Sequence, residues 1–120
     1  MTDELAEFID TSFSSVWALE VLLLLHRSGD RWWTPANLVA ELRGSEQVIS
    51  DSVVSLMRAG LVDVGPDGAI RYCAASAEQH ELVIQLDDLY RRKAAAVRRA
   101  IVRTGNDKLQ TFSDAFKFRK

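Results

Sequence analysis

The chain has 120 residues, 48% of them hydrophobic, and a formal net charge of −2. This length favours one domain with enough apolar material for a core. The longest apolar run, Val21 to Leu25, is far too short to cross a bilayer, and no basic segment precedes it as in a signal peptide. A single cysteine, Cys73, can form neither an internal disulfide nor a cysteine cluster, so we expect a cytoplasmic protein without membrane, metal or cofactor.

The apolar residues of the first segment predict a helical start. Leu5, Phe8 and Ile9 follow spacings of three and four, which is typical of a short amphipathic helix. Ser14 or Ser15 can cap a second helix over about residues 15–27, because a serine oxygen accepts an orphan backbone N–H. That second helix is apolar on most sides, so we expect it to be the central buried helix.

Two further helices are predicted between residues 34 and 59. Thr34 and Pro35 read as the cap and first residue of one helix, and Gly44 is expected to end it in a left-handed conformation. Ser45 can cap the next helix, which extends to about Ala59. The expected inner face of this helix consists of Val48, Ile49, Val53, Leu56 and Met57.

A β-hairpin and a long helix complete the predicted fold. Residues 61–64 and 69–73 read as strands around a tight Gly65 to Gly68 turn. An apolar stripe then predicts one helix over about residues 77–103, which Thr104, Gly105 and Asn106 should end. We therefore divide the chain into residues 1–76, 77–103 and 104–120. The stripe exceeds what a small domain can cover, so it predicts a homodimer through Leu82, Leu86, Leu89, Val97 and Ile101.

The segment from Trp33 to Tyr72 resembles a winged helix-turn-helix domain of the broad bacterial type that includes MarR-like transcriptional regulators. The matching pieces are Thr34-Pro35-x-x-Leu38-Val39-x-x-Leu42, Ser45-x-x-Val48, Val53-x-x-Leu56-x-x-x-Gly60-Leu61-Val62 and the Gly65 to Gly68 turn. The resemblance implies a mostly α fold with a small β-hairpin wing and a long C-terminal helix. It also implies a recognition helix that enters the major groove of double-stranded DNA.

The resemblance assigns the DNA contacts to particular side chains. Base contacts would come from the start of the recognition helix: Ser45, Glu46, Gln47, Ser50 and Asp51. Phosphate contacts would come from the arginines: Arg58, Arg71, Arg91, Arg92, Arg98 and Arg99.

The charges of the chain conflict with this simple picture. Residues 1–90 contain five basic and 15 acidic residues, for a net −10, whereas residues 91–120 contain ten and two, for a net +8. Glu46 and Asp51 raise the cost of bringing the recognition helix to phosphates, although Glu46 also suits the positive end of the helix dipole. One hypothesis is therefore a DNA-binding transcriptional regulator. The alternative is a winged-helix module that regulates a protein partner without binding DNA.

The basic end has its own possible roles. Leu109, Phe112 and Phe116 can align on one helical face among lysines and arginines. Such a segment can dock on a partner groove, on an anionic membrane or on its own dimer, and we favour its own dimer. Alternatively, the acidic part and the basic end simply neutralise each other, within one chain or across a dimer.

No residue pattern indicates an enzyme. His26 and His80 are far apart in sequence and are expected at the surface or at helix ends. Adjacent helical residues point about 100° apart, so Asp87 and Asp88 predict a solvated acidic face rather than an acid–base pair. Of the adjacent tryptophans Trp32 and Trp33, one is expected to be exposed.

Overall fold

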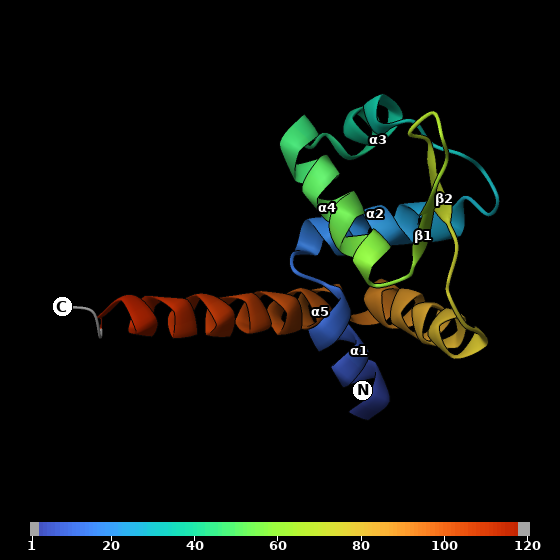
Figure 1. Ribbon diagram of the computed structural model, residues 1–120. Coiled ribbons are helices and arrows are strands. Elements are labelled where there is room, and N and C mark those ends of the chain that lie inside the picture. The colour runs from blue at the N-terminus through green and yellow to red at the C-terminus, as the bar shows by residue number, and fades with distance from the viewer. Residues whose placement is uncertain (1–2, 118–120) are drawn as a thin grey trace.

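The computed structural model describes the backbone of residues 3–117 and the side chains of residues 3–102. Within the described residues it contains five helices and one two-stranded antiparallel sheet (Figure 1). The elements in chain order are α1 (Asp3–Ser12), α2 (Val16–Arg27), α3 (Pro35–Leu42), α4 (Glu46–Arg58), β1 (Val62–Val64), β2 (Ile70–Tyr72) and α5 (Ala77–Lys117).

Helix α2 forms the centre of the molecule, as its sequence predicts. Ser15 caps it by accepting a hydrogen bond from the Ala18 N–H at 3.2 Å. Helices α3, α4 and α5 and strand β2 pack against it, and its buried residues are Ala18, Leu19, Val21, Leu22, Leu23 and Leu25. In Figure 1, α3 and α4 lie on one side of α2, whereas α1 and most of α5 lie on the other.

Local capping determines where α3 and α4 begin. The Thr34 side chain accepts from the Asn37 N–H, and the Ser45 side chain accepts from the Val48 N–H, both at 3.1 Å. The left-handed residue after α3 is Arg43, with φ of 56°, so the prediction that Gly44 adopts this conformation is wrong. Gly44 instead allows close packing, because a Cβ there would lie 3.1 Å from the Trp17 ring.

The hairpin follows the predicted strands closely. Val62 pairs with Tyr72, and Val64 pairs with Ile70. Trp33 extends the sheet by one bridge, because its N–H and C=O both bond to Ile70 at 2.7 Å. This bridge ties the segment before α3 to the hairpin.

Helix α5 differs from its prediction in where it is interrupted. Its backbone remains helical through residues 104–106, so the predicted end there is wrong, and the irregularity lies at Lys93, with φ of −139° and ψ of 53°. The bend redirects the chain so that Val97 and Ile101 are buried in the same core as α1 and α2. Beyond that contact the helix leads away from the body (Figure 1).

No single helix in the described part of the chain is long and apolar enough to cross a membrane. Only α1 and α2 together reach the required length and apolarity, and they are bent by 109° with respect to each other.

Candidate functional site

The exposed face of α4 is the first candidate surface. Ile49, Ser52 and Leu56 are buried against the rest of the fold. The opposite face consists of side chains at helical spacings of three and four, and they are Gln47, Ser50, Asp51, Val54, Met57 and Arg58. This stripe is acidic and polar in its first half and apolar at Val54 and Met57 in its second, before it ends at Arg58.

Two residues on α4 differ from the predicted inner face. Met57 is 49% exposed rather than buried, because it lies about 100° around the helix from Leu56. Ser52 is buried in its place, and its hydroxyl donates to the Val48 carbonyl at 2.8 Å. The hydroxyl of a buried serine can bond to a carbonyl of its own helix, so no apolar residue is needed there and the sequence does not mark the position as buried.

The residues proposed to read bases are exposed, but two have local partners. The Ser45 hydroxyl caps α4, and Gln47 Nε2 donates to Asp51 Oδ1 at 2.9 Å. Glu46 and Ser50 are exposed on the first turns of the helix. The structure therefore presents the predicted residues together at one end of α4, with a net negative charge.

The six arginines expected to hold phosphates do not form one surface with these residues. Arg58 is exposed at the last turn of α4, and Arg71 lies in the hairpin, 3.7 Å from Asp63 and 4.5 Å from the centre of the Trp32 ring. The others lie on α5, and they are Arg91, Arg92, Arg98 and Arg99. The first half of α4 points away from α5 (Figure 1).

Carboxylates of the chain already pair with most of the α5 arginines. Arg92 contacts Asp88 at 2.8 Å. Arg98 donates to the Tyr90 hydroxyl at 2.9 Å and lies 3.9 Å from Glu20. Tyr90 in turn donates to Glu20 at 2.5 Å, and burial together with this bond raises the Tyr90 pKa against the opposing effect of Arg98.

Asp87 is the most connected carboxylate in the described structure, which corrects its expected place on a solvated face. It is only 6% exposed and accepts from Arg27 at 2.6 and 3.0 Å, with Arg91 at 3.5 Å and His26 at 3.4 Å. Burial alone would raise the Asp87 pKa, but the Arg27 hydrogen bond and the surrounding positive charges outweigh it and lower that pKa. Asp88 remains exposed.

The two histidines lie close together, although they are far apart in sequence. The His26 and His80 rings are 5.9 Å apart, and the Tyr72 hydroxyl lies 2.7 Å from His80 Nδ1. Burial, followed by the neighbouring Cys73, raises the Tyr72 pKa to about 12. Their separation in sequence conceals this cluster, and among the described residues no group of His, Cys, Asp or Glu is placed to hold a metal ion.

The paired tryptophans divide as strand alternation requires. Trp33 is buried, whereas Trp32 is 42% exposed and packs beside Gly65 and Arg71 on the hairpin. Its indole therefore supports the turn while one part of the ring faces solvent.

The residues expected to form a dimer interface are largely covered by their own chain. Leu86, Val97 and Ile101 are buried in the core, whereas Leu82 and Leu89 are half-buried. A dimer through the first three would have to displace α1 or α2. The dimer itself stays a prediction.

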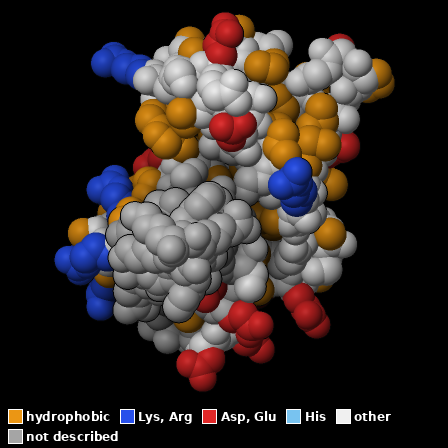
Figure 2. Space-filling view, turned by 60° about the vertical axis from the view of Figure 1, so that its left-hand side comes forward, with side chains coloured by type: hydrophobic (Ala, Val, Ile, Leu, Met, Phe, Trp, Pro, Cys, Tyr) orange, Lys and Arg blue, Asp and Glu red, His pale blue; other side chains and the backbone are white. Residues whose placement is uncertain are grey.

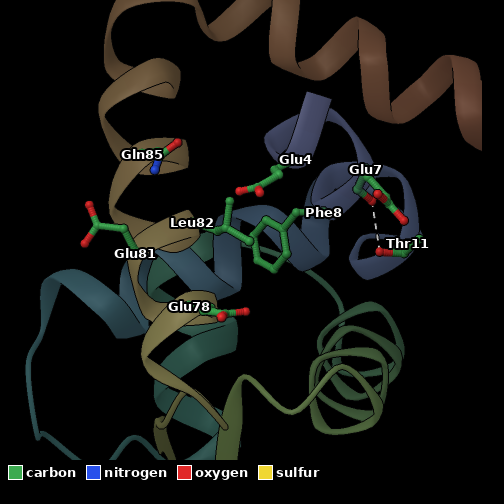
Figure 3. Close-up of a pocket in the computed structure, with 8 residues that line it drawn as sticks. All are labelled: Glu4, Glu7, Phe8, Thr11, Glu78, Glu81, Leu82 and Gln85. Atoms are coloured by element: carbon green, nitrogen blue, oxygen red, sulfur yellow. Dashed lines mark hydrogen bonds between the residues drawn. The ribbon is translucent and has the colours of Figure 1, made fainter. Parts of the chain in front are cut away.

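A groove between α1 and the first half of α5 is the second candidate surface (Figure 3). Its volume is about 530 Å³. Phe8 and Leu82 lie between the helices, with Glu4 on one side of the pair and Glu78 on the other. The remaining lining residues are Glu7, Thr11, Glu81 and Gln85, so the groove is strongly acidic.

Comparison of the chain with protein-family models, curated proteins and solved structures found no match.

Proposed function

We propose that this chain is a winged-helix regulatory module that binds a protein partner through the exposed stripe of α4. The stripe consists of Gln47, Ser50, Asp51, Val54, Met57 and Arg58. The element order supports the winged-helix assignment, since α3, α4 and the β1–β2 hairpin follow one another as the resemblance implies.

The composition of the stripe carries the proposal. Val54 and Met57 are 42% and 49% exposed and lie one turn apart on α4. Apolar side chains at the centre of a patch, with methionine enriched and a polar rim, are typical of protein interfaces. DNA interfaces are instead polar and strongly positive.

The surroundings of the stripe favour the same kind of partner. A hollow of about 520 Å³ lies between α4 and the end of α1, lined by Phe13, Asp51, Val54 and Arg58 among others. Such a hollow can receive one apolar anchor side chain. The carboxylates of Glu46 and Asp51 would attract basic residues beside that anchor.

DNA binding is the second candidate, and one observation favours it. Gln47 and Ser50 are exposed at the start of α4, where a recognition helix contacts base edges, and Arg43 and Arg58 are exposed near its two ends. Against it, the α5 arginines lie across α2 from that end of α4 and are largely paired with carboxylates. Phosphate neutralisation, which supplies most non-specific affinity, therefore has little support near the reading residues.

Photo-crosslinking in the cell that naturally produces the protein distinguishes binding of a protein partner from binding of DNA. A photoreactive residue in place of Ser50 should give protein adducts, and Met57→Lys should abolish them. Ile84→Lys is the matched control, because Ile84 is similarly exposed, at 41%, but lies on α5. Nucleic-acid adducts at Ser50, together with random-sequence duplex binding that falls steeply with salt, would contradict the proposal.

A further inference from the structure

We infer that the acidic groove between α1 and α5 binds the basic aromatic segment 108–120 of a second copy of this chain, giving a reciprocal homodimer. This inference concerns a different surface from the α4 stripe and does not depend on the proposed function.

The groove offers an apolar floor beneath a ring of negative charge. Phe8 and Leu82 form the floor, with Glu4 on one side of them and Glu78 on the other (Figure 3). Glu7 and Glu81 line the groove further out. All eight lining residues are described, and none is basic. Red side chains also gather along the lower edge of the molecule in Figure 2, at the height of α1.

Helix structure explains only part of this acidity. Glu4 and Glu78 stand in the first turns of α1 and α5, where the helix dipole favours a carboxylate. Glu7 and Glu81 lie beyond those turns and form no ion pair with a residue that the structure describes. An external positive charge would relieve the repulsion among the four.

The proposed occupant has the complementary chemistry. By sequence, segment 108–120 carries positive charge at Lys108, Lys117, Arg119 and Lys120. It also carries apolar residues at spacings of three and four, namely Leu109, Phe112 and Phe116. Aromatic anchors that fill an apolar floor, with basic residues at the acidic rim, are a common mode by which a helix occupies a groove.

The direction of α5 indicates that the segment comes from another copy. After the bend at Lys93 the helix leads away from the groove of its own chain (Figure 1). The 25 residues from Lys93 to Lys117 span roughly 36 Å as a helix. A second chain related by a twofold axis would receive this segment and return its own, which closes the assembly at two copies.

Sedimentation equilibrium of the full chain tests the inference. Wild type should be a dimer at micromolar concentration, and its association should weaken as salt rises. Glu7→Lys with Glu81→Lys should raise the dimer Kd roughly tenfold or more, and so should Lys108→Glu with Lys117→Glu. Asp30→Lys with Glu41→Lys makes the same charge change on exposed sites away from the groove and should leave the dimer intact.

Mixing the two defective variants provides the decisive measurement. A mixed dimer contains one wild-type groove with a wild-type segment, and one groove and segment that both have reversed charges. The mixture should therefore dimerise at concentrations at which neither variant dimerises alone. Circular dichroism checks that each variant remains helical. A monomeric wild type, dimerisation by either variant as strong as wild type, or failure of the mixture to associate would each overturn the inference. A monomer that binds anionic vesicles would assign the segment to a membrane surface instead.

Discussion

Replacing Asp87 by asparagine should remove the charge that connects α2 to α5. The carboxylate is buried and accepts two hydrogen bonds from Arg27, at 2.6 and 3.0 Å, with Arg91 and His26 within 3.5 Å. A hydrogen bond to a charged group contributes about 1.5–3 kcal/mol to stability. The loss is reduced here because Arg27 is partly exposed and because the asparagine side chain can still accept a hydrogen bond from Arg27. We therefore expect Asp87→Asn to lower the free energy of unfolding by about 2 kcal/mol.

The pH dependence of this loss follows from the lowered pKa of Asp87. The Asp87 carboxyl has a pKa of about 3.9 in the unfolded protein and a lower pKa in the folded protein. The stabilisation is therefore fully present above the unfolded pKa and is lost as the pH falls through the folded pKa. The difference between wild type and Asp87→Asn should be constant at neutral pH and shrink in strong acid.

Urea unfolding followed by tryptophan fluorescence measures both effects. Asp88→Asn is the matched control, because Asp88 is the next residue and its ion pair with Arg92 is exposed, so its loss should cost less than about 1 kcal/mol. Equal stability of the two variants at neutral pH would contradict a stabilising role for the buried Asp87 charge. So would a difference from wild type that does not shrink in acid.

Three further predictions address caps, backbone and titration. Ser45→Ala removes the oxygen that accepts the Val48 N–H, so urea unfolding should show a loss of about 1 kcal/mol, and Ser45→Asp should retain stability. Gly60→Ala places a Cβ at φ of 74° and 3.2 Å from the Ala75 Cβ, so it should cost at least about 1–2 kcal/mol by the same assay; an unchanged midpoint would contradict this. Tyr72 has a pKa raised to about 12 and Tyr90 a raised pKa, so ultraviolet absorbance should show no tyrosinate titrating near 10 in the folded protein. Because folding favours the neutral form of both tyrosine hydroxyls, their contribution to the free energy of unfolding is fully present below the unfolded pKa of about 10. It is lost as the pH rises through the pKa values of the folded protein.

Elements set by neighbouring residues were predicted well. The helix starts at Ser15, Thr34 and Ser45 depend on one side-chain oxygen and the backbone three residues later, so they can be read locally. The hairpin likewise follows from the turn between Gly65 and Gly68 and the strands that flank it. These features need no knowledge of the rest of the chain.

The bend in α5 shows where local reasoning ends. Thr104, Gly105 and Asn106 are poor helix formers, yet the backbone remains helical there and departs from helix at Lys93. Nothing about a lysine beside three alanines predicts a break. The bend allows Leu86 and Val97, on either side of it, to reach the same core, and burial of apolar area outweighs the local preference.

The candidate surfaces divide in the same way. The order of the helices, the hairpin and the acidic character of α4 could be predicted from the sequence, because spacing, caps and charge are properties of the chain. Tertiary packing was needed to show that Asp87 is buried beside Arg27, that His26 lies near His80, and that α1 and α5 enclose an acidic groove. These contacts join residues dozens of positions apart, and the packing of whole helices brings them together, which no local pattern records.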